Sequence, residues 1–588
     1  MNDRGPYERW TRRRLLRAAT GLTVTGATAP AAAPAFAGGA ADVPGVPGVS
    51  GTDPSGFPEQ VRLYRSPYRN WSGETVSDGL WACAPRDTGQ VVAVVNWAHR
   101  NGWTVRPRGH SHGWSPLTLA DGARDGRPVL LMDTTRHLTD VRVSAPAGSP
   151  ASVRAGAGVS MEELLTRLEE HGLGLTAAPA PGDLTLGGVL AVDAHGTAVP
   201  ARGEVRAPGG TYGSLSNRVL SLTAVVWDAD GGEYTARTFD RDHPDCAVLL
   251  AHLGRALATE AVLRVGGNDN LRCVSRTDIP ATELFAPPGR GGRTLASFVE
   301  ETGRVEAIWF AFSEHPWLKV WSVSPGRPLT SRPVDRPYNY PFSDNVPRPL
   351  ADLAGTMVTE AAWYLAPALG EAQSTAAAAG LVATASADLW GPSKNTLLYI
   401  KPTTLRITAN GYAVVTARSR VQRVVAEFTA FYRERLAAYA AEGRFPVNGS
   451  VEIRVTGLDR PEEADVPGAQ VPALSALRPV PDRPEWDTAV WLDVLTLPGT
   501  PDAPSFYREL ERFLLRAFDG TYALARVEWS KGWAYTDRAA WDDQEVIGTA
   551  VPASLPGWDG AVAALDRLDP HRVFTNPFLD RLLDRGGA

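Results

Sequence analysis

A loop rich in arginine, glycine and histidine constrains the fold of this chain more than any other feature. Its sequence, RPRGHSHGWS over residues 106–115, directly follows a short β-type run that begins at Thr104. Glycine lets a backbone approach a ligand closely, arginines and free amides suit a pyrophosphate, and imidazole offers a nucleophilic nitrogen. The pattern predicts a ligand-binding loop at the end of a β-strand.

Two other interpretations of this loop remain open. His110 and His112 form a His-x-His pair that is compatible with a metal, although no third ligand with suitable spacing lies nearby. The loop is also compatible with a purely structural role.

A second glycine-rich element lies further along, with PGDLTLGGV at residues 181–189 and DAHGT at 193–197. Each motif alone is typical of a turn, so the order of the motifs carries the information. AGAGV at 155–159 precedes a helix but lacks the third small residue of a dinucleotide fingerprint, and GLGLTA at 172–177 follows a helix. A Rossmann site is therefore disfavoured.

The periodicity of apolar residues predicts an α+β organisation. Ser160 is placed to cap a helix, with Glu163 at the capping-box position. After about Asn270 the chain changes to long apolar and aromatic strands, which indicates a second domain. The other expected elements are helices at 88–101, 360–387 and 420–441 and strands at 104–107, 129–132, 219–227, 307–312, 318–323, 404–407 and 451–455.

Five motifs in order resemble the FAD-binding domain of the vanillyl-alcohol oxidase superfamily: GHS (109–111), AGAGV, LTLGG (184–188), HGT (195–197) and GSLSNRVLSL (213–222). The resemblance implies an α+β, two-domain fold with an FAD-binding domain of PCMH type and a large α+β substrate domain. It implies that FAD is attached covalently to His110, and His112 is the alternative attachment site. The implied cofactor contacts are Arg106, Arg108, Gly109, Ser111, His112, Thr185, Gly187, Gly188, Asp193, His195, Gly196 and Thr197.

A candidate catalytic pair lies in the second domain. Glu452 and Arg454 are two residues apart on an expected strand, so they share one face. An exposed ion pair is the alternative. The pair resembles the ExR strand of alditol and aldonolactone oxidases, and WSKGW at 529–533 resembles the pattern that puts Lys531 beside their flavin. Glu306 is a candidate partner for Arg454.

From Phe57 to the end, the chain resembles the flavin-linked, type II cholesterol oxidases, with EAIWF (306–310) and YNYPF (338–342) typical of their substrate domain. Apolar and aromatic walls bind a steroid by burial, at about 25 cal/mol per Å². The resemblance implies oxidation of a 3-hydroxysteroid by O2 to the ketosteroid and H2O2, with Δ5 to Δ4 isomerisation. Glu452 would be the base, Arg454 would stabilise negative charge and Lys531 would position the hydroxyl, while Glu452 or Glu306 would isomerise.

Other functions compete with this one. An alditol or aldonolactone oxidase and a carrier-linked flavin dehydrogenase share the fold, and a catalytically inactive flavin or steroid binding protein is the third alternative. The joint presence of Glu452, Arg454 and Lys531 disfavours the last.

The N-terminus reads as a twin-arginine export signal over residues 1–37, with TRRRLLR at 11–17, and predicts secretion. Its removal takes away six arginines and two acidic residues, so the formal charge changes from −6 to −10. Such an acidic chain does not favour nucleic-acid binding. Transient contact with a membrane or lipid aggregate is expected for sterol extraction.

The expected boundaries are a flexible leader at 38–56, the FAD domain at 57–270, the substrate domain at 271–560 and a C-terminal strap at 561–588.

Overall fold

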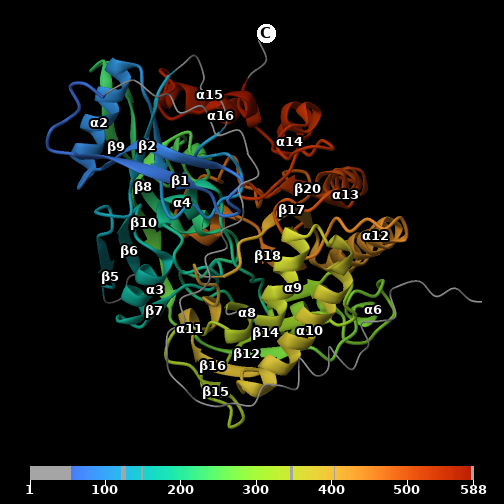
Figure 1. Ribbon diagram of the computed structural model, residues 1–588. Helices are drawn as coiled ribbons and strands as arrows, with labels where there is room; N and C mark the ends of the chain where they lie inside the picture. Colours follow the sequence, from blue (N-terminus) through green and yellow to red (C-terminus); the bar gives the residue numbers. More distant parts are fainter. Residues whose placement is uncertain (1–53, 121–126, 147–149, 345–347, 403, 585–588) are drawn as a thin grey trace, which may run out of the picture.

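The computed structural model describes residues 54–120, 127–146, 150–344, 348–402 and 404–584. The expected export signal and nearly all of the expected leader lie outside these residues. Two lobes are apparent in Figure 1, with the blue, teal and first green elements, up to β10, in one and the yellow-green to orange part of the chain in the other. Mixed helices and sheets in both lobes confirm the α+β class.

The first sheet places the arginine- and histidine-rich loop. Its strand order is β1-β2-β4-β3, and β4 pairs in parallel with both β2 and β3. The bounds are β1 (Arg62–Arg69), β2 (Val76–Ala84), β3 (Thr104–Arg108) and β4 (Val129–Asp133). Helix α2 (Thr88–Asn101) is capped by the side chain of Asp87 and ends at Gly102, whose φ of 70° is left-handed. Because β3 runs parallel to β4, the loop leaves the sheet at the carboxyl ends of both strands.

The second sheet is antiparallel, in the order β5-β6-β10-β8-β9. Ser160 caps α3 by accepting from the Glu163 amide, while the Glu163 carboxylate pairs with Arg167. The elements of this part are β5 (Val141–Ser144), β6 (Ser152–Gly156), α3 (Met161–Glu169), β7 (Leu173–Gly174), α4 (Leu186–Ala191), η3 (Leu215–Arg218), β8 (Val219–Asp228), β9 (Glu233–Asp240), α5 (Cys246–Leu249), β10 (Leu257–Arg264) and β11 (Gly266–Gly267).

A nine-stranded sheet dominates the second lobe, in the order β15-β16-β12-β14-β13-β18-β19-β17-β20. Every neighbouring pair is antiparallel except β15 with β16. The strands are β12 (Asn270–Arg276), β13 (Arg304–Phe310), β14 (Trp317–Val323), β15 (Arg332–Pro333), β16 (Asp388–Pro392), β17 (Thr408–Thr416), β18 (Ser450–Gly457), β19 (Thr488–Thr496) and β20 (Ala523–Val527).

Helices surround this sheet, and α9 and α10 lie beside each other in front of it in Figure 1. The longest, α12, packs against α13 and β19. The helices of this lobe and of the C-terminal segment are α6 (Ala281–Leu284), α7 (Leu295–Thr302), α8 (Pro341–Asp344), α9 (Arg348–Thr359), α10 (Ala366–Ala383), α11 (Ser393–Leu397), α12 (Val421–Ala441), α13 (Ala503–Ala517), α14 (Val551–Ser554), α15 (Trp558–Leu568) and α16 (Pro577–Leu582).

Two expected elements of the second lobe differ from the structure. The helix expected from residue 360 begins at Ala366, because Ala361 has a φ of 51° and a short 3-10 turn follows. The prediction of a strand at 404–407 is wrong. Strand β17 begins at Thr408, where pairing with Thr496 starts, and the preceding residues instead line a cavity.

Contacts at and next to the HGT motif join the two lobes. Ala198 bridges to Thr456 of β18, and the Thr197 hydroxyl lies 2.7 Å from the carbonyl oxygen of Val305 and 3.1 Å from that of Val455. Thr197 therefore ties the first lobe to β13 and β18.

The C-terminal segment returns to the first lobe, where α15 lies near the blue elements in Figure 1. The amide of Val105 in β3 donates to the Val573 carbonyl at 2.8 Å, and the Asn576 amide donates to the Leu117 carbonyl at 3.1 Å. Within the part of the chain that the structure describes, no helix is long and apolar enough to cross a membrane.

Candidate active site

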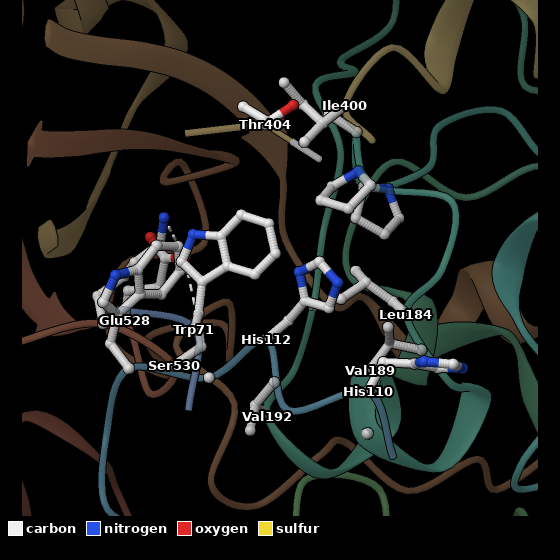
Figure 2. Close-up of a pocket in the computed structure, with 18 of the residues that line it drawn as sticks. Trp71, His110, His112, Leu184, Val189, Val192, Ile400, Thr404, Glu528 and Ser530 are labelled. Atoms are coloured by element: carbon white, nitrogen blue, oxygen red, sulfur yellow. Dashed lines mark hydrogen bonds and ion pairs between the residues drawn. The ribbon is translucent and has the colours of Figure 1, made fainter. Parts of the chain in front are cut away.

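A cavity of about 490 Å³ lies between the loop after β3, helix α4 and one face of the nine-stranded sheet. Figure 2 shows part of its lining, with His110, His112, Glu528 and Ser530 among the labelled side chains. Polar groups of the first lobe line one part. Apolar side chains of the second lobe line another, namely Ile308, Phe310, Trp317, Trp321, Phe342, Leu350, Leu369, Leu495 and Leu497.

The two histidines of the loop have different surroundings. His110 is solvent-exposed and borders the cavity. Nε2 of His112 donates to Asp183 at 2.7 Å, and its ring stacks on Trp71 with centroids 4.3 Å apart. Burial opposes the ionisation of Asp183, but its hydrogen bond with His112 leaves the pKa of the carboxyl lowered. His112 is thus engaged on two sides, whereas His110 is available to a ligand.

The two arginines of the loop make internal contacts. Arg106 is buried and donates to the carbonyls of Thr118 at 3.1 Å and Gly254 at 2.8 Å, and also to Leu117. Arg108 pairs with Asp133 at 3.0 Å beside a smaller cavity on the other side of His110. Arg106 therefore braces the loop, because its guanidinium donates to backbone carbonyls, and it also borders the cavity.

Glycines let the loops of the first lobe pack on one another. A Cβ on Gly109 would stand 2.2 Å from Oγ1 of Thr185, and one on Gly187 would stand 3.0 Å from the Ala157 carbonyl oxygen. Thr185 caps α4 by accepting from the Gly188 amide at 3.4 Å. The GHS and LTLGG motifs are thus in direct contact.

Asp193 is a buried acid with a left-handed φ of 60°. Oγ of Ser475 lies 2.5 Å from Asp193 and 2.6 Å from Asp459. A hydroxyl has one hydrogen, so one of the two acids must itself donate to Ser475. Burial and the neighbouring Asp459 raise the pKa of Asp193 well above its usual value. Burial raises the pKa of Asp459 as well, so the Asp193–Asp459 pair holds this proton between them.

His195 is held neutral under the sheet. Its ring stacks on Trp491 with centroids 3.5 Å apart, and Nδ1 donates to the Gly196 carbonyl at 2.9 Å. Burial lowers the pKa of His195 to about 3. Gly196 packs against Ala178, where a Cβ would stand 2.7 Å from the carbonyl oxygen.

Four charged residues form what we call the polar ladder on adjacent strands: Glu306 of β13, Glu452 and Arg454 of β18, and Asp493 of β19. Register places Glu306 opposite Arg454 and Glu452 opposite Asp493. The Arg454 guanidinium donates to Glu306 at 2.8 Å, to Asp493 at 2.8 Å and to Glu452. The expected partnership of Glu306 with Arg454 is present, and an exposed Glu452–Arg454 pair is not what the structure shows.

Lys531 extends the polar ladder from the chain after β20. Its Nζ lies 3.6 Å from Asp493, 4.0 Å from Glu528 and 4.2 Å from the centre of the Trp114 ring. Gly411 of β17 lies opposite Asp493 and makes room, since a Cβ there would stand 2.6 Å from Cγ of Lys531.

The acids of the polar ladder differ in the direction in which their pKa values shift. Burial raises the pKa of Glu452, against the attraction of Arg454. Burial and repulsion from Glu528 raise the pKa of Asp493 to about 6. Burial also acts on Glu306, but Arg454 and Lys319 outweigh it and lower its pKa. Glu452 is thus the ladder carboxylate that both borders the cavity and binds a proton more readily than usual.

Sequence reasoning missed four members of this site: Lys319, Tyr399, Asp493 and Glu528. A usable signal exists for two of them. Lys319 and Asp493 are single charged residues inside otherwise apolar strand sequences, WLKVW and VWLDVL. Burying a charge is expensive, so a lone charge in a central strand indicates a functional cluster.

The polar groups of the first lobe that line the cavity have the chemistry needed to hold a flavin nucleotide. Among the described residues, Oδ1 of Asp193 and Nε2 of His252 are buried without a hydrogen-bond partner, and both residues line the cavity. Gly113 and Gly188 present backbone to the same cavity. These polar atoms and open backbone would match the hydroxyls and ring edges of such a cofactor.

Comparison with known proteins decides the family. A family model described as "Cholesterol oxidase, substrate-binding" matches residues 270–584, and one described as "FAD binding domain" matches residues 81–234. The chain belongs to the cholesterol oxidase family. Two solved structures agree with this family. A solvent-stable cholesterol oxidase is 56% identical with a TM-score of 0.89, over 90% of this chain and 100% of that one. The cholesterol oxidase from B. sterolicum is 46% identical with a TM-score of 0.87, over 90% and 99%.

More distant curated relatives share part of the chain. L-gulonolactone oxidase of Mus musculus is 22% identical over 42% of this chain and 49% of its own length. L-gulono-1,4-lactone dehydrogenase of Mycobacterium tuberculosis is 24% identical over 36% and 44%. The chain thus spans about half the length of these curated relatives. As a member of the cholesterol oxidase family with an FAD-binding domain, the chain is an FAD-dependent oxidoreductase.

Proposed function

We propose that this enzyme oxidises the 3-hydroxyl group of a sterol such as cholesterol to a ketone, reduces O2 to H2O2, and moves the Δ5 double bond to the conjugated Δ4 position. One observation carries the proposal beyond the family match. Three members of the polar ladder, Glu306, Glu452 and Arg454, border a cavity whose second-lobe lining is mainly apolar. A single hydroxyl on a large fused ring system is the substrate that fits such a wall.

FAD would be held by the loop after β3, by the Thr185–Gly188 turn and by Asp193 and His195, with a covalent bond to His110. When bound, it supplies the acceptor for the hydride from the carbinol carbon and passes the two electrons to O2. The exposure of His110 and the double engagement of His112 support His110 as the attachment site.

The polar ladder would supply the proton chemistry. Glu452 borders the cavity and would accept the hydroxyl proton. Arg454 would stabilise the negative charge that develops on the oxygen, and Lys531 would orient the hydroxyl. Once the hydroxyl proton has left Glu452 and been consumed with O2 in forming H2O2, the same carboxylate would remove a proton on one side of the double bond and return it on the other. Glu306 is less suited, because two cations hold it ionised.

The substrate class is tested by peroxide formation with cholesterol, xylitol and L-gulono-1,4-lactone at equal concentration. Turnover of cholesterol alone, with a product that absorbs as a conjugated enone, is the expected result. Preferential turnover of xylitol or the lactone would overturn the proposal in favour of the alditol or aldonolactone alternative.

The electron acceptor is tested separately. With cholesterol as donor, O2 consumption should match ketosteroid formation one to one. A rate that requires an artificial electron carrier, with little O2 consumed, would identify a carrier-linked dehydrogenase instead.

We further propose that the protein is exported through the twin-arginine route. Replacement of Arg12 and Arg13 by lysine should trap precursor inside the producing cell, and this is checked by fractionation and immunoblotting. Replacement of Arg4 and Arg9 by lysine is the matched control. Unchanged secretion of the first variant would overturn the signal assignment.

Contact with a lipid surface would accompany sterol uptake. Leu350 of α9 and Leu369 of α10 line the cavity, while Val358, Tyr364 and Val382 of the same region are exposed. Cholesterol-containing vesicles should therefore retain the enzyme in co-sedimentation, and replacing the three exposed side chains by serine should weaken that retention.

A further inference from the structure

A lysine outside the expected site is buried next to the polar ladder. Lys319 of β14 is completely inaccessible to solvent. Its Nζ lies 2.9 Å from the centre of the Tyr399 ring and within 5.3 Å of the ring centres of Trp317, Trp321 and Tyr340. Within the described part of the chain, this Nζ makes no hydrogen bond. An ammonium withdrawn from water is destabilising unless a nearby anion compensates for it.

The compensating anion is Glu306. Register pairs Lys319 with Glu306 across β14 and β13, and Nζ lies 3.9 Å from Oε2 of the carboxylate. The Tyr399 hydroxyl donates to the same Oε2, while Nε of Arg454 donates to Oε1 at 2.8 Å. Glu306 therefore stands between two buried cations, one facing the cavity and one behind it.

We propose that Lys319 is a positioning residue: its ammonium fixes the Glu306 carboxylate, and through that carboxylate it holds the Arg454 guanidinium against Glu452. This inference rests on the proposed function of the polar ladder. Lys319 does not line the cavity. Its influence on the reaction must therefore pass through neighbours that do line the cavity, and Glu306 is the charged one among those it contacts. This separates Lys319 from Lys531, which lines the cavity itself.

The charges around the pair determine how it responds to pH. Cys273 of β12, Glu306 of β13, Glu452 and Arg454 of β18 and the two tyrosines face Lys319. Burial lowers the pKa of Lys319 to about 8, against the attraction of Glu306. Facing Glu306 are Arg454, Lys319 and Tyr399, and the two cations lower its pKa despite burial. Both partners are therefore charged at neutral pH.

The sign of the expected effect follows from linkage. The lowered pKa of Glu306 contributes stability that is present above its unfolded pKa and is lost as pH falls through the folded pKa. Removing the Lys319 charge raises the folded pKa. Both the loss of stability and the loss of ladder geometry should then begin at higher pH.

The experiment is a double-mutant cycle of the holoenzyme with Lys319→Met, Glu306→Gln and both together, with kcat and melting temperature measured from about pH 4 to about pH 8. Lys319→Met should move the acid limb of the kcat profile, and the acid limb of the melting curve, upward by about 1 pH unit. In the Glu306→Gln background, Lys319→Met should cause no further movement of either limb. Lys401→Met, at an exposed lysine, is the matched control and should leave both limbs in place.

Two results would overturn the proposal. The first is equal effects of Lys319→Met with and without Glu306, which would make Lys319 an independent packing residue. The second is an acid limb that does not move. If Lys319→Met does not fold, recovery of soluble, flavin-loaded protein in the double variant supports the coupling, and failure to recover contradicts it. The melting curves need no steroid, so they remain decisive even if cholesterol is not the substrate.

Discussion

At the scale of single residues, two side chains that look alike in sequence differ in environment. His110 and His112 are two positions apart, yet His112 donates to Asp183 and stacks on Trp71, whereas His110 is exposed beside the cavity. Glu452 and Glu306 also diverge, because burial dominates the pKa of the first and two cations dominate that of the second. The surroundings of each side chain, and not its residue type, therefore determine its reactivity at this site.

The flavin attachment can be tested at this scale. His110→Ala should release all flavin on acid precipitation, because the only exposed imidazole of the two is removed. His112→Ala should keep the flavin on the protein, although its weaker loop packing should lower the melting temperature. Absorbance of pellet and supernatant measures both. Yellow protein in the acid pellet of His110→Ala would move the attachment to His112.

The base can be tested by Glu452→Gln, which keeps the shape of the side chain. Flavin reduction by cholesterol should slow by about 10² to 10⁴-fold, because a general base is removed. Steroid affinity should change by less than about threefold, roughly 0.7 kcal/mol, since burial of apolar surface provides it. Anaerobic stopped-flow measures the rate, and the spectral shift of the oxidised flavin measures binding.

The control for this variant is Glu485→Gln, at an exposed acid outside the cavity. It should leave both quantities unchanged. If flavin reduction and isomerisation in Glu452→Gln both proceed within about threefold of the wild-type rates, Glu452 is not the base.

At the scale of elements, the central strands of the nine-stranded sheet align charges that lie far apart in the chain. Strands β13, β18 and β19 bring Glu306, Arg454 and Asp493 together, so that the Arg454 guanidinium donates hydrogen bonds to both carboxylates. Gly411 of strand β17 has no side chain, and this leaves the space that Lys531 occupies. The sheet register thus builds the polar ladder.

Gly411→Ala tests this use of β17. The new Cβ would stand 2.6 Å from Cγ of Lys531 and 2.7 Å from Oδ1 of Asp493, so Lys531 must move. Turnover should fall by about 10- to 100-fold from misplacement, while overpacking destabilises the fold by about 1–3 kcal/mol. Steady-state kinetics and thermal melting measure the two effects. Gly560→Ala, where a Cβ meets nothing within 4 Å, should leave turnover at the wild-type level.

At the scale of the whole molecule, the C-terminal segment joins the end of the chain to the first lobe. The buried Asp569 carboxylate accepts hydrogen bonds from the Val573 and Phe574 amides at 2.9 and 3.0 Å and pairs with Arg255 at 2.5 Å, and Tyr234 also donates to it. The segment supports β3 and therefore the loop that carries His110.

Asp569→Asn should destabilise the protein by about 3–5 kcal/mol, because it leaves the buried Arg255 charge undercompensated. Each kcal/mol lowers the melting temperature of a large domain by about 2–4 °C. Asp482→Asn, at an exposed acid, is the control and should melt like wild type. Equal melting temperatures of the two variants would show that the Asp569 network does not support the first lobe.

The sequence by itself determined the family, the ordered motifs of the first lobe and several local elements, with α2 matching the expected residues 88–101 and β8 differing from the expected strand by one residue. Periodicity and capping are local properties, so a single sequence carries them. Only the tertiary structure decided that Arg106 braces the loop, that β17 starts at Thr408, and that the lone strand charges Lys319 and Asp493 meet Glu306 and Arg454. These outcomes depend on the pairing of distant strands and on burial, because register sets which charges meet and burial sets which of them hold a proton.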